Sequence, residues 1–490
     1  MPYNHGVYNQ EQETSLTTPI QGTAGLQVIF GTAPIHLAAD PAAAVNKPVV
    51  CYSFAECQQA MGYSDDFENF TLCQSMDACF RVFNVAPIIL VNVLDPSKSS
   101  HITQNTEEAC DVVDGAVAYG KQFVLLDTIE VKNASATLVA GSDYVATHAE
   151  DGTVTITILS EAAREAETLN VSSTSLKPDG VTAADIVGGV DALTGKETGL
   201  ELVRQIYPRF GMTPGILLAP GWSHTPVVAA ALQAKTEKVN GNFDCVTYLD
   251  ISTDAEEDGA EVYTDVRTAK EALGATSPHA AALWPMGAVG DKVYYLSAMF
   301  AALTAYTDAN NSDVPYESPS NKDLKITSTV LKDGTEVLLD QQQANDLLNA
   351  NGVITAINAN GYKAWGNNTA AYPSTSDPKD RWLAVRRFFD WDGNGFILTY
   401  FQKVDKPGNT RLIQSIVDSQ NIIGNGYVAR GYCAGYRTEF KSDENPITNL
   451  LDGHLTVHTY LAPYIPAEEI ENIREYDVAA LEAALTGGGE

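Results

Sequence analysis

The stretch Gly215-Ile-Leu-Leu-Ala-Pro-Gly-Trp-Ser223 is the most informative part of the sequence for the fold. Its apolar run has no polar interruption, which predicts a strand buried on both faces. Pro220 and Gly221 end that strand, and Ser223 or Thr225 can cap the helix that follows. A strand, a tight turn and a helix in this order form the repeating unit of a parallel α/β sheet.

Similar units are predicted on both sides of this stretch. Apolar runs predict strands, and amphipathic or alanine-rich segments between them predict helices. The predicted strands are 26–33, 87–94, 122–127, 243–250 and 280–284, and the predicted helices include 107–119, 199–207, 259–273 and 292–307. Strands separated by helices favour a parallel sheet covered on both faces, so residues 23–127 and 182–318 are assigned to an α/β core domain.

Two further domains are predicted from changes in the pattern. Residues 128–181 contain short β-branched runs such as 153–159, split by glycine turns, which predicts a small all-β domain inserted into the core. Residues 319–465 mix helices and strands and form a predicted α+β C-terminal domain. Within it, 382–389 and 396–401 are predicted to flank a glycine-rich turn.

Both ends of the chain are predicted to be extended arms. Residues 1–22 are polar and show no core pattern. Residues 466–490 follow Pro463 and Pro466 and alternate apolar with polar side chains, although little of their own domain remains for them to pack on. This C-terminal segment is therefore a candidate for packing on another chain.

Composition limits the classes of partner. The chain has 490 residues and a net charge of −32, which argues against nucleic acid and against an anionic membrane as direct partners. The seven cysteines form no C-x-x-C pair, which favours buried free thiols in a reducing compartment. Neither a signal peptide nor an apolar run long enough to span a bilayer is found, so we expect synthesis and folding in a cytoplasm without membrane insertion.

One motif leaves an enzyme class open. Gly221-Trp-Ser-His-Thr225 lies where the nucleophile elbow of an α/β serine hydrolase would lie, with Ser223 as nucleophile and Asp250 and His279 as partners in the right chain order. Thr225 replaces the second glycine of that motif. A helix-capping Ser223 beside a surface histidine is therefore the preferred interpretation, and the hydrolase remains the alternative.

A second motif concerns calcium. Asp390-Trp-Asp-Gly-Asn394 matches the first half of a calcium-binding loop, but Phe401 stands where the closing glutamate is required. A glycine-rich hairpin turn is preferred, and a weak Ca²⁺ site stays open. We therefore predict no catalytic, cofactor-binding or metal-binding residue and no cofactor.

Several segments, in order along nearly the whole chain, carry a resemblance to a known family. The chain resembles the contractile-tail sheath proteins of myophage-like prophages and R-type bacteriocin particles. The segments that carry it are Gly25–Pro34, Asp185–Gly195, Pro214–Ser223, Asn351–Val353, Trp365–Thr369, Val385–Arg387, Glu444–Pro446 and Pro463–Ile470.

The resemblance implies an architecture and a mechanical function. It implies an α/β core, an outward-facing β insertion, a C-terminal domain that faces an inner tail tube, and arms that complete a sheet in neighbouring subunits. The subunits would polymerise helically around the tube and contract to drive it through a target cell envelope, without enzymatic activity. The implied partners are further copies of the chain, the tail tube protein, and baseplate and tail terminator proteins.

The resemblance also implies where the particle is made and which regions make contacts. Assembly would take place in the cytoplasm of a bacterial host, and the product would be a virion or a released phage-tail-like particle. A tail tube or another particle component is a further alternative, although the length and the α/β core speak against a small β-barrel tube protein. The candidate residues for pairing between arms are Val7, Tyr8, Leu16, Ile470, Ile473, Tyr476 and Val478, and those facing the tube are Lys403, Lys406 and Arg411.

Overall fold

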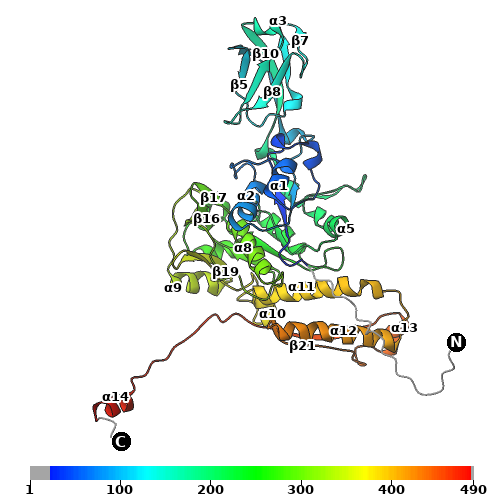
Figure 1. Cartoon of the computed structure of the whole chain (residues 1–490), viewed down its shortest axis with the longest axis vertical. Helices are drawn as coiled ribbons and strands as arrows, with labels where there is room; N and C mark the ends of the chain where they lie inside the picture. The colour runs from blue at the N-terminus through cyan, green and yellow to red at the C-terminus, as the bar shows by residue number, and fades with distance from the viewer. Residues whose placement is uncertain (1–22, 487–490) are drawn as a thin grey trace, which may run out of the picture.

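An eight-stranded sheet forms the centre of the computed structural model, which describes residues 23–486 (Figure 1). Six neighbouring strands are parallel, and the first and last strands in the order join antiparallel at the two edges. The order is β2 (Val49–Cys51), β3 (Ile88–Asn92), β1 (Gln27–Gly31), β13 (Ile216–Leu218), β14 (Val246–Asp250), β15 (Ala280–Leu283), β19 (Val353–Asn358) and β20 (Tyr362–Trp365). The predicted mixed α/β fold with a parallel sheet is confirmed.

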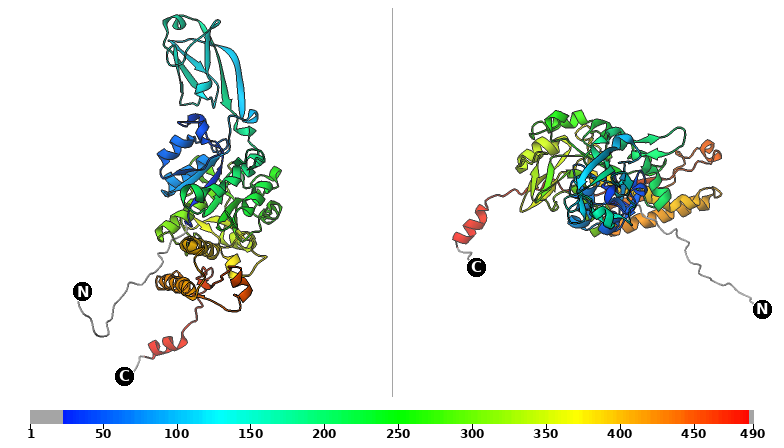
Figure 2. Two further views of the ribbon diagram at one scale, coloured as in Figure 1. Left: turned by 90° about the vertical axis from the view of Figure 1, so that its right-hand side faces the viewer. Right: turned by 90° about the horizontal axis from the view of Figure 1, so that it is seen from above.

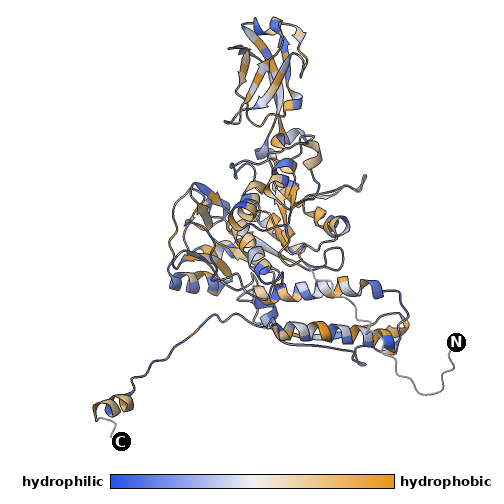
Figure 3. Cartoon of the chain, in the orientation of Figure 1, coloured by the Kyte–Doolittle hydropathy of each residue, from blue (hydrophilic) through white to orange (hydrophobic). Residues whose placement is uncertain are grey.

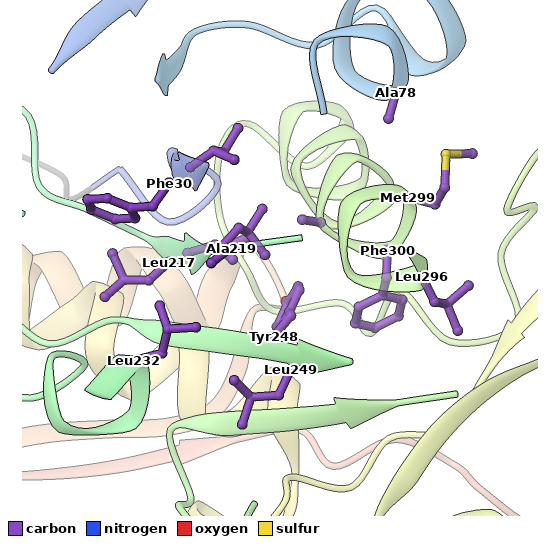
Figure 4. Close-up of a cluster of buried hydrophobic side chains, with 14 of the residues drawn as sticks. Phe30, Ala78, Leu217, Ala219, Leu232, Tyr248, Leu249, Leu296, Met299 and Phe300 are labelled. Carbon is purple, nitrogen blue, oxygen red and sulfur yellow. The ribbon is translucent and has the colours of Figure 1, made fainter. Parts of the chain in front are cut away.

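The stretch 215–223 lies in the middle of this sheet. Strand β13 pairs with β1 on one side and with β14 on the other, and all three of its residues are buried. Helix α6 (Pro226–Ala234) follows it, and the long helix α8 (Leu296–Asn310) packs on β13 and β14. Figure 4 shows Leu217, Tyr248 and Phe300 in this core, where the rings of Tyr248 and Phe300 lie 5.1 Å apart between centroids.

A separate β unit stands at one end of the molecule, joined to the core by few connections (Figures 1 and 2). It contains a four-stranded and a three-stranded sheet around its own cluster of buried apolar side chains. The first sheet has the order β4 (Ile102–Asp111), β10 (Thr168–Leu176), β6 (Glu130–Asn133) and β7 (Ala136–Thr137), and the second has the order β5 (Ala116–Tyr119), β9 (Val154–Ile158) and β8 (Tyr144–His148).

The helix predicted over 107–119 is wrong, because β4 and β5 occupy this segment. Asp114 and Gly115 both have positive φ angles, of 51° and 77°, between the paired residues Val113 and Ala116. This is the geometry of a two-residue hairpin turn, for which Asp-Gly is a preferred sequence. The β unit therefore begins near Ile102, earlier than residue 128. The strand predicted at 122–127 is also absent, since only Val124 makes an isolated bridge there, to Ser175.

Two long helices lie side by side at the opposite end of the molecule (Figures 1 and 2). They are α11 (Leu383–Tyr400) and α12 (Thr410–Ala429), and the two-stranded sheet of β21 (Cys433–Glu439) and β22 (His458–Pro463) packs on α12. Gly424 makes this packing possible: a Cβ atom there would lie 2.0 Å from the Tyr436 ring.

The glycine-rich turn predicted between 382–389 and 396–401 is wrong, because α11 is continuous through it. Tertiary contacts outweigh the low helix propensity of glycine here. Asn394 accepts a hydrogen bond from the Asp244 amide at 3.0 Å and donates one to the Asp244 carbonyl at 2.7 Å, while Asp390 pairs with Arg386 one turn earlier. A calcium loop cannot form on a helix, and the described residues 23–486 contain no cluster able to hold a metal ion.

The chain after Pro463 leaves the body. Residues 464–477 form neither helix nor strand, and the short helix α14 (Val478–Leu485) stands apart from the rest of the molecule (Figure 1). Apolar residues dominate α14, as Figure 3 shows. No helix within residues 23–486 has the length and apolar character needed to cross a membrane.

Candidate assembly interface

The C-terminal arm presents apolar side chains to solvent. Ile470, Ile473, Tyr476 and Val478 are exposed by 88%, 84%, 70% and 65%. Isolated apolar residues on a surface are common, but a run of them on a segment that packs on nothing marks an interaction site. The structure places these four candidates together on one segment; Ile470 lines one side of a groove at the root of the arm, and all four stay exposed. The N-terminal candidates Val7, Tyr8 and Leu16 lie outside the described residues.

The two-stranded sheet at the far end of the molecule has open edges. Among the described residues, β21 pairs only with β22, and both strands keep one side without a partner strand. A two-stranded sheet is marginally stable, and an unpaired edge offers backbone N–H and C=O groups to an added strand. This surface was not predicted from the sequence, because Gly435 interrupts the apolar pattern of β21 and no strand was expected there.

The basic candidates Lys403, Lys406 and Arg411 lie at or beside the connection between α11 and α12; Lys406 and Arg411 are exposed, and Lys403 is half-buried. Residues 379–441 hold ten basic and six acidic side chains, a net charge of +4 in a chain of −32. Phe401 and Val404, exposed by 68% and 63%, lie in the same connection and were not predicted. This end of the helical pair therefore offers both positive charge and apolar surface.

The serine hydrolase alternative is not supported by the geometry. Ser223 is fully buried, and its hydroxyl donates a 2.7 Å hydrogen bond to the Asp250 carboxylate and accepts one from the Asp250 amide. His279 lies against the Cys245 carbonyl and Asp390 instead, through Nδ1. A serine that donates to a carboxylate, without a histidine in between, has no general base in the required place.

Ser223 supports a buried carboxylate, which leads to a pH-dependent prediction. Burial raises the pKa of Asp250 from 3.8 to about 6, although Ser297 and Ser223 donate to the carboxylate. The folded protein therefore holds this proton more tightly than the unfolded chain does, and protonation of Asp250 stabilises the fold. This stabilisation is complete below about pH 4 and is lost as the pH rises through 6.

The substitution Ser223→Ala removes a hydroxyl from the charged carboxylate, so it should cost more stability at pH 8 than at pH 5. We expect a loss of about 1–3 kcal/mol at pH 8, measured by urea unfolding at both values. Ester hydrolysis should be unchanged in the same variant. Equal losses at the two pH values would contradict the role given to Ser223, and loss of a measurable esterase activity would restore the hydrolase.

The mixed α/β fold, which carries the open two-stranded sheet and the exposed arm, is shared with subunits of contractile sheaths. The chain superposes on a subunit of an extracellular contractile injection system, the PVC sheath complex in its contracted state, with a TM-score of 0.58 and 14% identity over 98% of this chain and 99% of the other. At this identity the similarity establishes the fold.

Sequence comparison gives the family relationship. The chain is 26% identical over 473 residues to the tail sheath protein of Burkholderia phage BcepMu, covering 94% of each chain. It is 27% identical to a putative prophage major tail sheath protein of Pseudomonas aeruginosa, covering 73% of this chain and 87% of the relative. No protein-family model matches the chain. The chain is a homologue of the tail sheath proteins of phages and prophages.

Proposed function

We propose that this chain is the structural subunit of a contractile tail sheath, which polymerises helically around an inner tube and contracts to drive the tube through a target cell envelope. The observation that carries this proposal is similarity over 94% of both chains to a phage tail sheath protein. The exposed arm and the open two-stranded sheet support it, because one offers apolar side chains and the other offers unpaired backbone groups to a second copy.

The arms act by strand addition. Residues 470–478 of one copy, together with an N-terminal arm that includes Val7, Tyr8 and Leu16, pair with the β21–β22 sheet of neighbouring copies. Backbone hydrogen bonds supply most of this contact, and alternate side chains supply its register. Because donor and acceptor surfaces differ, the contact is heterologous and builds an open helix when it does not close into a ring.

Contraction then needs no nucleotide. Subunits re-pack as rigid bodies, while the arms keep the lattice connected, and a kinetic barrier holds the extended form until a baseplate signal. The helical end with Lys403, Lys406 and Arg411 faces the tail tube, and the β unit faces outward. The remaining partners are the baseplate and tail terminator proteins, and assembly takes place in a bacterial cytoplasm before the particle is released.

Electron microscopy of the purified full-length protein tests this function. We expect hollow cylinders in the absence of any other particle component, since the subunit carries both the donor and the acceptor of the strand. Adding the cognate tube protein should set a uniform inner diameter. A protein that stays monomeric at every concentration, and that hydrolyses esters through Ser223, would instead support the alternative enzyme.

A further inference from the structure

Arg381 is held more firmly than an ordinary surface arginine. Its guanidinium lies 4.6 Å from the ring centre of Tyr372 and 4.1 Å from that of Trp382. Its Nε donates a 3.0 Å hydrogen bond to Asn368 Oδ1, and its carbonyl accepts one from the Thr369 amide at 2.7 Å. Stacking and hydrogen bonding thus fix the orientation of the guanidinium before it meets any other group.

The guanidinium of Arg381 contacts a carboxylate of the C-terminal arm. Arg381 Nη2 lies 3.3 Å from Glu468 Oε2, and Asn367 Nδ2 donates to Glu468 Oε1, also at 3.3 Å. Both carboxylate oxygens of Glu468 are therefore bound, each from a different side chain. The contact lies in a groove of about 1140 Å³, which the first residues of the arm line on one side.

Glu468 is also the last residue tied to the body. Between 469 and 486, the hydrogen bonds in the described structure, such as Ala480 to Asp477 and Thr486 to Glu482, all stay within the segment. No ion pair joins this segment to the rest of the described chain, and its side chains are exposed. Glu468 is thus the last point in the described chain at which a hydrogen bond or an ion pair ties the arm to the body.

We propose that Arg381 is a positioning residue that, through Glu468, holds the root of the C-terminal arm and sets the direction in which the arm leaves the subunit. The proposal rests on the assembly role given to the arm under the proposed function. An arm aimed before it meets its neighbour loses less orientational freedom on pairing, so assembly is favoured. Release of this contact lets the arm turn while it stays attached to the neighbouring subunit.

The role of Arg381 in directing the arm can be tested by measuring the distance between two spin labels. The measurement uses the full-length chain below its assembly concentration. Labels at Glu475→Cys in the arm and Leu193→Cys on the body report the arm direction, with the half-buried Cys110 replaced by serine in every protein. We expect Glu468→Ala and Arg381→Ala to broaden the distance distribution, with a fall of about fivefold in the ratio of held to free arms. Arg381→Lys should give a distribution of intermediate width, between those of the parent and of Arg381→Ala, because lysine keeps the charge but loses the planar group that stacks on the rings.

Glu469→Ala is the matched control, because it removes the same charge one residue further along, where no ion pair is formed. If Glu468→Ala and Glu469→Ala give the same distribution as the parent, Arg381 does not position the arm. If Arg381→Ala misfolds, Glu468→Ala still tests the proposal, because the Glu468 side chain takes no part in the core. The arm proposal itself fails on a different result, namely cylinders that persist when residues 466–490 are removed.

Discussion

Arg387→Ala is expected to lower the free energy of unfolding by about 3–5 kcal/mol. Arg387 and Asp308 are both almost fully buried and form a bidentate ion pair between α11 and α8. Arg387 also donates to the Ala24 carbonyl at 3.1 Å, just before β1. Removing the guanidinium leaves a buried carboxylate without its cation, and urea unfolding at pH 7 measures the loss.

The pKa of Asp308 gives the same prediction a second observable. Burial already raises that pKa, and Arg387 opposes the rise. In Arg387→Ala the pKa should rise further, so the destabilisation should diminish as the pH falls and Asp308 takes up a proton. The double variant Arg387→Met with Asp308→Leu should recover most of the stability, because it removes both charges at similar volume.

An exposed arginine provides the control for charge alone. Arg267 pairs with Glu271 one helical turn away, and both side chains are about two-thirds exposed. Arg267→Ala should change the free energy of unfolding by less than about 0.5 kcal/mol. If Arg387→Ala behaved like Arg267→Ala, the α8–α11 contact would not depend on this ion pair.

The sequence predicted the inner strands of the central sheet well because they are buried on both faces. It did not predict that β19 and β20, which lie within the predicted C-terminal domain 319–465, complete the same sheet. Continuous apolar runs such as 216–218 and 88–91 have few other structural solutions in a chain of this size. It predicted α11 poorly, since Gly393 and Gly395 favour a turn locally. The contacts of Asn394 with Asp244, which is 150 positions away in the chain, hold that segment helical, and no local pattern reveals them.

The candidate interface likewise combines features that local sequence indicates with features that depend on the fold. The arm was predicted because prolines and apolar alternation are local features. The position of Arg381 beside Glu468 was not, because it depends on rings and amides that the fold brings together from 367 to 382. The Asp114-Gly115 turn is a different case: its signal was present in the sequence, and the helical interpretation of 107–119 overlooked it.

The strongest effect on function is expected from removal of residues 466–490. The truncated protein should fold with an unchanged melting temperature, because the described part of this segment, residues 466–486, buries almost nothing, and its hydrogen bonds and ion pair with the body are those of Glu468. Its assembly should fail. Burial of even two of the four exposed apolar side chains contributes about 3 kcal/mol or more, so the assembly concentration should rise at least about a hundredfold.

Two variants separate the parts of the arm in this experiment. Deletion of 479–490 removes α14 beyond Val478 and the residues after it, so that 470–478 stays complete. The double substitution Ile470→Asp with Ile473→Asp keeps the length of the arm and destroys the apolar contact of its extended segment. If strand addition by 470–478 is the main contact, the double substitution should match the full deletion in electron micrographs and sedimentation, and the shorter deletion should still form cylinders. Normal cylinders from the full deletion would show that this arm does not hold subunits together, and contacts of the core and the helical pair would then have to build the lattice.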